Sequence, residues 1–152
     1  ILVTMGAGAA PPVRGLRPVA AVAPGVAAAT GLSLQQLAAA LVGQLRPAAV
    51  VCVDSLCSAE GQRLGRTVQF SDTGLYPAQA DHTRHLTRDT LGVPVVAAGI
   101  PTLMQAQEGA DLVVTPRALD SVIAHGAALL AGSVNRALQP RLTVQQLCWL
   151  TG

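Results

Sequence analysis

The chain has 152 residues, with ten arginines, no lysine, eight acidic residues and a formal net charge of +2 at pH 7. This length fits one domain, and the scattered arginines do not form the basic stripe of a nucleic-acid-binding protein. Half of the residues are apolar, yet no apolar run approaches the ~20 residues of a membrane span. Neither a nucleic acid nor a membrane is therefore expected as a direct partner.

The first third of the chain predicts a lead-in, a strand and a helix. Residues 5–16 are dense in Gly, Pro and Ala, which indicates a loop-rich lead-in over residues 1–16. Residues 18–23 form a short apolar run closed by Pro24-Gly25, which is typical of a strand entering a turn. Ser33 is a helix N-cap candidate, and the apolar spacing after it predicts a helix through about Leu45.

Three further apolar runs predict strands, at residues 48–53, 67–70 and 93–98. The first is continuous and bounded by polar residues, which favours a strand covered on both faces. A polar stretch, residues 71–88, separates the second run from the third. Each run is expected to end in a polar or Gly/Pro turn.

The last part of the chain predicts two helices. Thr115 is a possible N-cap, with Pro116 at the first helical position. That helix is expected to continue to residue 138, and Thr143 can cap a last short helix through Leu150. Strands that alternate with helices indicate an α/β fold, a single three-layer domain with a mostly parallel sheet. We expect a lead-in, a core and a short C-terminal helix, at 1–16, 17–138 and 139–152.

Two aspartates are candidates for chemistry. Asp54 follows the run at 48–53, and the carboxyl ends of parallel strands are where binding and catalysis collect. It is expected at the end of a central strand, at the rim of a cleft, although a turn former or helix cap fits the same position. Asp72 precedes Thr73-Gly74, where an aspartate commonly bonds its own downstream backbone in a turn. That turn is expected to shape the cleft beside Asp54.

Other site types have weaker support. Asp81, His82 and His85 could suggest a metal site, but a solvated loop fits better because three or four placed ligands are not defined. No nucleotide-binding glycine motif follows a strand. No metal or cofactor is predicted. Three cysteines without a CxxC pair favour a reduced, intracellular protein, with Cys52 as a small buried hydrophobe.

Four ordered blocks resemble the germination protease family. They are Arg17-Pro-Val-Ala-Ala-Val-Ala-Pro-Gly25-Val26, Val53-Asp54-Ser55-Leu56, Ser71-Asp72-Thr73-Gly74 and Thr90-Leu-Gly-Val-Pro-Val-Val-Ala-Ala-Gly-Ile-Pro-Thr102. Val113-Val114-Thr115-Pro116 is similar to the start of the family's C-terminal helices. The resemblance spans roughly residues 15–138.

The resemblance implies an endopeptidase that degrades small acid-soluble spore proteins in the spore core cytoplasm during germination. It implies a fold like the germination protease/hydrogenase maturation protease core, lacking its N-terminal part, and a homo-oligomer made as a zymogen. Asp54 would be one of two catalytic carboxylates, whose partner lies upstream and is absent here. Asp72, Thr73, Gly74 and Tyr76 would bind substrate or shape the cleft. A pair works because like charges push two pKa values apart, leaving one acid and one base.

The chain also departs from the family. The glycine-rich loop that follows Ser-Asp-Thr-Gly is replaced by Pro77-Ala-Gln-Ala-Asp81, and an acidic family position is Gln105. These departures keep a rival open, a non-catalytic homologue or fragment that retains the fold as a scaffold or binding subunit. A metal-dependent hydrolase using His82 and His85 is a second rival. We expect the 152-residue chain alone to fold but not to hydrolyse protein.

Overall fold

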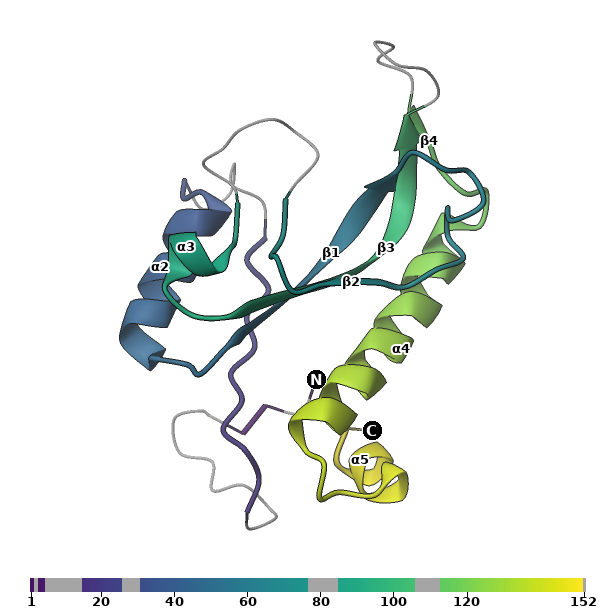
Figure 1. Ribbon diagram of the computed structural model, residues 1–152. Helices are drawn as coiled ribbons and strands as arrows, with labels where there is room; N and C mark the ends of the chain where they lie inside the picture. The colour runs from purple at the N-terminus through teal and green to yellow at the C-terminus, as the bar shows by residue number, and fades with distance from the viewer. Residues whose placement is uncertain (2, 5–14, 26–30, 77–84, 106–112, 152) are drawn as a thin grey trace. The chain divides into compact units, whose positions relative to one another are not determined.

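A computed structural model describes residues 1, 3–4, 15–25, 31–76, 85–105 and 113–151 (Figure 1). The chain divides into two compact units. The larger unit is Pro24–Ile123, and the smaller unit joins Ile1–Ala23 to Ala124–Gly152. Across the described ranges, no helix is both long enough and apolar enough to cross a bilayer.

In the larger unit, helix α2 (Leu34–Leu45) begins where the sequence predicts. The Ser33 hydroxyl accepts from the Gln36 backbone N–H, and the Gln36 side chain accepts from the Ser33 backbone N–H. This reciprocal capping box satisfies two donors that a helix start leaves without partners. The helix ends at Arg46, which takes a left-handed conformation (φ 48°) ahead of Pro47.

The sheet contains β1 (Val50–Ser58), β2 (Gln69–Ser71), β3 (Val95–Gln105) and β4 (Val113–Val114). Its order is β1-β3-β2, and β4 pairs with the end of β3 (Figure 1). The longest strand, β3, thus lies between β1 and β2. Registered rows cross the three strands, with Asp54 opposite Gly99 and Gly99 opposite Gln69.

The larger unit combines helices with a sheet, as an α/β fold does. The strands of this sheet run in mixed directions, so the expectation of a mostly parallel sheet is wrong. β1 and β3 run parallel, whereas β3 is antiparallel to both β2 and β4. Parallel neighbours need a crossover of a dozen or more residues, usually a helix. β1 and β2 are instead joined by a short turn-rich segment, residues 59–68, which contains no helix.

Two strands also extend beyond their predicted ends. β1 does not stop before Asp54 but continues to Ser58, and β3 passes through Gly99 and Pro101 to Gln105. Polar, glycine and proline residues therefore lie inside these strands and do not form turns after them. Local pattern misplaced the ends because neighbouring strands can hold a residue of low strand propensity in extended conformation.

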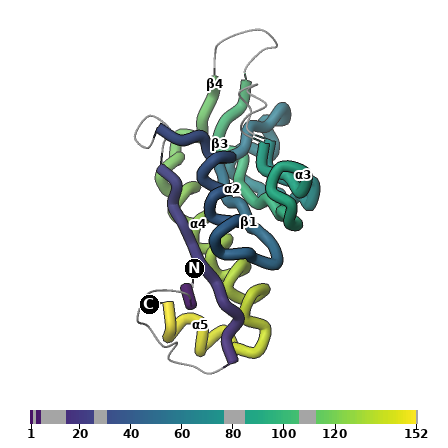
Figure 2. The backbone as a smooth tube through the Cα atoms, turned by 90° about the vertical axis from the view of Figure 1, so that its left-hand side faces the viewer, coloured from purple at the N-terminus to yellow at the C-terminus, as the bar shows by residue number. Residues whose placement is uncertain are grey.

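The core of the larger unit lies on the side of the sheet where α2 packs. Helix α3 (Arg88–Leu91) lies beside α2 (Figures 1 and 2). The buried apolar side chains come from β1, β3 and the segment around α3, and they are Cys52, Leu75, Leu86, Leu91, Val95 and Ala97. Leu34, Ala38 and Val42 of α2 pack against them one helical turn apart.

In the smaller unit, an extended N-terminal segment is held by side chains. Thr4 Oγ1 donates to the Arg17 carbonyl and accepts from the Val19 N–H. The Gln139 side chain accepts from the Arg17 N–H at 2.8 Å and donates to the Arg17 carbonyl at 2.9 Å. The strand predicted at 18–23 is wrong: among the described residues this segment joins no sheet, and its printed contacts are the Val19 N–H to Thr4 Oγ1 bond and the Thr4 N–H, which donates to the Val19 carbonyl at 2.9 Å.

The C-terminal helices are α4 (Leu119–Leu138) and α5 (Val144–Thr151). The first helical bond of α4 runs from Val122 N–H to the Ala118 carbonyl, so the helix begins later than the predicted start at Pro116. Its predicted continuation to residue 138 is confirmed, as is Thr143 as the cap of the last helix, where it forms a capping box with Gln146.

Candidate active site around Asp54

Asp54 lies in the middle of β1, with its side chain exposed. Its Oδ1 accepts a hydrogen bond of 2.8 Å from the backbone N–H of Ser55. The predicted location, the carboxyl end of a central strand, is wrong: β1 stands at one side of the described sheet and β3 is central. The carboxylate is accessible to water and held by one backbone donor, which suits a group that accepts a proton.

Gly99 explains how Asp54 fits beside β3. A Cβ at position 99 would overlap the Asp54 carbonyl oxygen and lie 2.7 Å from Leu56 Cγ. Only glycine allows the two strands to approach this closely without displacement. The glycine in the Ala-Gly-Ile-Pro block therefore has a packing role that fixes the backbone of Asp54.

Asp72 is not brought next to Asp54. β2 is antiparallel to β3, so Ser71 pairs with Ala97, which is opposite Cys52 and not Asp54. Two strand spacings across and two residues along place Ser71 about 12 Å from Asp54 between Cα atoms. Asp72 follows Ser71 in the direction away from Asp54, whereas carboxylates that share a proton lie about 3 Å apart.

The turn at residues 71–76 is built by hydroxyls. Ser71 Oγ accepts from the Thr73 N–H at 3.2 Å and lies 2.7 Å from Thr73 Oγ1, while the described Asp72 carboxylate makes no hydrogen bond. Gly74 has φ 109°, and a Cβ there would overlap the Leu86 carbonyl oxygen. The Asp-Thr-Gly glycine is thus required by the backbone. The predicted turn is present, but the Ser71 hydroxyl makes the hydrogen bond to the turn that was expected of the Asp72 carboxylate.

Tyr76 lies at the end of this turn and is 55% exposed. Its hydroxyl donates to the Thr73 carbonyl at 3.4 Å, and its ring lies 4.8 Å from the His85 ring at a tilt of 59°. The aromatic pair joins the two ends of the segment 77–84. His82 and Asp81 lie outside the described residues, and within the described ranges no cluster of three metal-ligating side chains occurs.

Gln69 is a polar neighbour of Asp54 that sequence reasoning missed. It lies across Gly99 from Asp54 in the same registered row, so the two side chains share one face of the sheet. A carboxylate and an amide on either side of a glycine offer a proton acceptor and a hydrogen-bond donor. No local signal could have found Gln69, because the pairing of β2 with β3 connects residues distant in sequence.

Cys52 shares the face of Asp54, two residues earlier on β1. Burial raises the pKa of the Cys52 thiol, and the nearby negative charge of Asp54 raises it further. The thiol is therefore held protonated and is a poor nucleophile. This agrees with the prediction that Cys52 is a small buried hydrophobe, and Cys57 and Cys148 are also free thiols.

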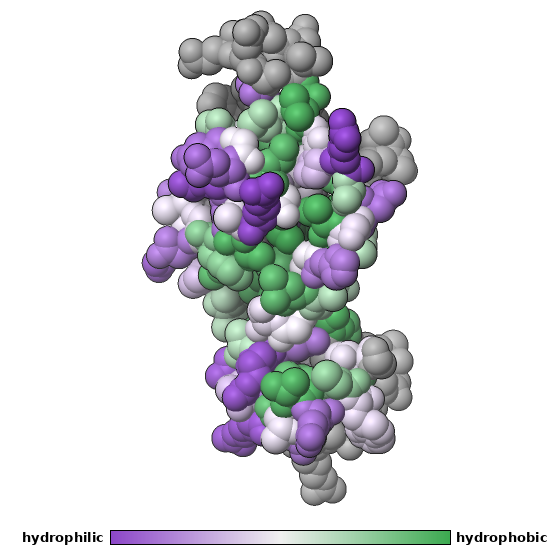
Figure 3. Space-filling model, turned by 90° about the vertical axis from the view of Figure 1, so that its right-hand side faces the viewer, coloured by the Kyte–Doolittle hydropathy of each residue, from purple (hydrophilic) through white to green (hydrophobic). Residues whose placement is uncertain are grey.

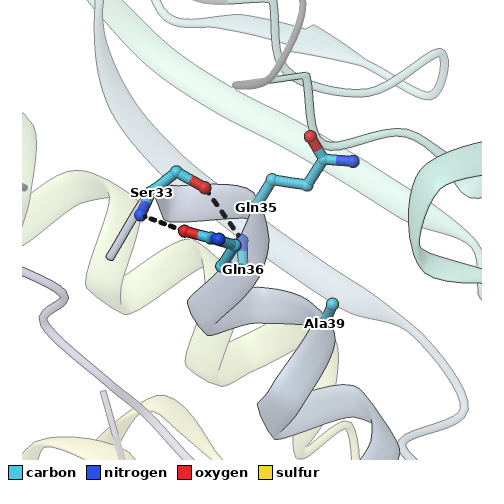
Figure 4. Close-up of a pocket in the computed structure, with 4 residues that line it drawn as sticks. All are labelled: Ser33, Gln35, Gln36 and Ala39. Carbon is cyan, nitrogen blue, oxygen red and sulfur yellow. Dashed lines mark hydrogen bonds between the residues drawn. The ribbon is translucent and has the colours of Figure 1, made fainter. Parts of the chain in front are cut away.

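An open depression lies elsewhere, along the first turns of α2. It is lined by Ser33, Gln35, Gln36 and Ala39, and the capping-box hydrogen bonds are visible within it (Figure 4). Its polar groups are amides and a hydroxyl, without a carboxylate. It does not include Asp54 or Asp72, so it is not the cleft expected beside them.

Comparison with known proteins identifies the family. The sequence model of the germination protease family, Peptidase_A25, matches residues 11–108, which include Asp54, the Ser71–Gly74 turn and Gly99. The chain belongs to the germination protease family. The matched residues come from both of the compact units.

Individual relatives agree. The chain is 29% identical over 180 residues to a germination protease of Clostridium perfringens strain SM101, covering 87% of this chain and 55% of that protein. It is 38% identical over 114 residues to one of Halalkalibacterium halodurans, covering 74% of this chain and 29% of that protein. A germination protease of Bacillus subtilis strain 168 is 39% identical over 95 residues. The chain thus spans about half or less of the length of these relatives.

Proposed function

We propose that this chain is part of a spore germination endopeptidase that hydrolyses small acid-soluble spore proteins, with Asp54 as one of two catalytic carboxylates. The observation that carries the proposal is the family match over residues 11–108, which includes Asp54. The exposed position of the Asp54 carboxylate supports it, because a proton acceptor must reach water.

In this proposal Asp54 acts as a general base. The ionised carboxylate takes a proton from water while the oxygen of that water attacks the peptide carbonyl carbon. A second group, kept protonated, donates a proton to the leaving amine. Asp72 is too far away to be that group, and we propose that the second carboxylate lies upstream of this chain, as the family resemblance implies. Asp72, Thr73, Gly74 and Tyr76 are proposed to shape the substrate path. We also propose that the protein is made as a zymogen, assembles into homo-oligomers and acts in the spore core.

A non-catalytic role is the second candidate. In the part of the chain that the structure describes, the registered neighbours of Asp54 are Gly99 and Gln69, and neither is acidic. One carboxylate cannot serve as both base and acid in the same step. A homologue of this kind would keep the fold and bind spore proteins without cleaving them.

Substitution of Asp54 by Asn in the complete gene product tests the assignment. The change keeps size and hydrogen-bonding capacity but removes the charge, so cleavage of a small acid-soluble spore protein should slow by ~10²–10⁴-fold. Asp89→Asn, another exposed carboxylate in the larger unit, is the matched control and should cleave at the parent rate. Equal rates for Asp54→Asn and the parent would refute the role of Asp54.

The 152-residue chain provides a second test. We expect a cooperative unfolding transition and no cleavage of the same substrate. Cleavage that disappears in Asp72→Asn would show that the catalytic pair is wrong and that this chain is a self-sufficient protease. Cleavage that depends on added metal would favour the hydrolase in which His82 and His85 hold a metal ion.

A further inference from the structure

The row that holds Asp54, Gly99 and Gln69 borders the core of the larger unit. One row earlier, Cys52 is opposite Ala97, and both side chains are buried in that core. Side chains two residues apart on a strand share a face. Asp54, which is exposed, and Gln69, which is half-buried, therefore lie where the core-bearing face of the sheet reaches solvent. All five residues belong to the same compact unit.

The opposite face of the sheet has a different character. Successive side chains of a strand point to opposite faces, so Val53 and Phe70 lie on the other side from Asp54 and Gln69. They are apolar, and they are 49% and 63% exposed. Apolar side chains also form a good part of the exposed surface (green in Figure 3). The carboxylate and the amide of the Asp54 row are thus a polar pair among apolar neighbours.

The floor between these two polar side chains is apolar. Gly99 has no side chain, and a Cβ there would lie 2.7 Å from Leu56 Cγ and 3.1 Å from its Cδ1. Leu56 is half-buried and packs against the core. A hydrogen bond beside such a surface is electrostatically stronger than one in water, because the local dielectric constant is lower.

One atom of the proposed reaction still lacks a partner. The water oxygen bonds to the peptide carbon, the water proton passes to Asp54, and the carbonyl π electrons move to the carbonyl oxygen. That oxygen stays negative until its electron pair returns and the C–N bond breaks, with the nitrogen taking its proton from the second carboxyl group. Preorganised hydrogen-bond donors aimed at such an oxygen are usually the largest single source of rate acceleration.

We propose that the side-chain amide of Gln69 is a catalytic residue that donates a hydrogen bond to this oxygen. The inference rests on the proposed function, because it takes Asp54 as the general base. The amide nitrogen carries two hydrogens and stays neutral, so it stabilises an anion without exchanging a proton. Gln36, Gln139 and Gln146 use their side chains to hold backbone groups. Among the described residues, no such bond engages Gln69.

The spacing of the row fits a peptide group between Asp54 and Gln69. Two strand spacings put their Cα atoms about 10 Å apart. A hydrogen bond to water, the attack distance, the C=O bond and a second hydrogen bond together span about 10 Å when straight, and less when bent. The Ser55 N–H holds Oδ1 of Asp54 at 2.8 Å, which leaves Oδ2 for the water. The longer Gln69 side chain can lean across Gly99 to close the remaining distance.

Gln69→Met in the complete gene product tests the assignment. Methionine keeps about the same length and removes the donors. With a small acid-soluble spore protein as substrate, kcat should fall ~10²–10³-fold, as it does when one oxyanion donor is removed. KM should stay within ~2-fold of the parent, because the bond strengthens only as charge develops. Gln35→Met makes the same change at another half-buried glutamine of the larger unit, so this matched control should have the parent kcat.

Binding measurements separate this role from a packing role. A phosphinic peptide, built on a cleavage site mapped with the parent, carries anionic tetrahedral oxygens like those of the intermediate. Gln69→Met should bind it ~10²–10³-fold more weakly. In the Asp54→Asn background, the same change should leave the Kd of the intact spore protein within ~2-fold. A residue that only packs would weaken both ligands alike.

A second variant covers a failure of Gln69→Met to fold. Gln69→Glu keeps the shape of the side chain and replaces its donors by a charge that opposes the oxyanion, so kcat should fall at least as far. A parent kcat in either folded variant, or equal losses of affinity for the two ligands, would overturn the proposal. A slow Asp54→Asn with an unchanged Gln69→Met refutes this inference alone. Asp54→Asn at the parent rate refutes the proposed function and this inference with it.

Discussion

Gly99→Ala should destabilise the larger unit by separating β1 from β3 at Asp54. The added methyl group would overlap the Asp54 carbonyl oxygen and lie 2.7 Å from Leu56 Cγ and 3.1 Å from its Cδ1. A side chain such as Leu56 can rotate, but a backbone carbonyl can move only with its strand. The substitution therefore forces a shift of β1.

The expected loss follows from two terms. Overpacking in a well-packed region costs about 1–3 kcal/mol, and weakening one ladder hydrogen bond adds about 1 kcal/mol. We expect the free energy of unfolding to fall by about 3 kcal/mol. For a protein of this size, that corresponds to a decrease in Tm of about 6–12 °C.

Thermal and denaturant unfolding of the variant measure this loss, with Gly43→Ala as the matched control. Gly43 lies inside α2, and a Cβ there would meet no atom within 4 Å. Alanine is the better helix former by about 1 kcal/mol, so this control should be more stable than the parent. A Gly99→Ala protein that unfolds within 1 °C of the parent, taken as a rough error of the assay, would refute the close approach of the strands.

Three further outcomes are expected. Gln139→Ala should lower stability by about 1–3 kcal/mol in denaturant unfolding, because the Arg17 N–H loses its partner and the Arg17 carbonyl keeps only Thr4 Oγ1; an unchanged midpoint would contradict this clamp. Ser33→Ala should lower stability by about 1 kcal/mol through loss of the helix cap, visible in the same experiment. Cys52 should resist alkylation in the native chain, and Asp54→Asn should lower its pKa by removing one of the two causes that raise it.

The raised pKa of Cys52 also predicts how stability varies with pH. The folded chain holds the thiol proton more tightly than the unfolded chain does. This contribution is present below the unfolded pKa of a cysteine, about 8.5, and is lost as the pH rises toward the folded value. Unfolding measured from neutral to alkaline pH should show a decline in the parent that is smaller in Cys52→Ala. An identical decline in both proteins would contradict the assignment.

Local sequence signals predicted the elements that local interactions determine. Helix α2 has its cap, its apolar face and its end within the same fourteen residues or so, about the length at which helices become stable units. The end of β1 and the direction of β2 depend on partners far along the chain, and both were misjudged. Asp54 was found because an apolar run precedes it. Gln69 was not identified from the sequence, since only the sheet register makes it a neighbour of Asp54.

The Gln139 clamp on Arg17 has a consequence for the order of folding. The two residues are 122 positions apart, and the smaller unit is interrupted by the whole of the larger one. Contacts of such separation form slowly because the intervening chain must first be closed into a loop. During synthesis, residues 24–123 leave the ribosome before Gln139 does, and domains fold from the N-terminal side as they emerge. The extended N-terminal segment therefore cannot be held by this clamp until Gln139 has been synthesised.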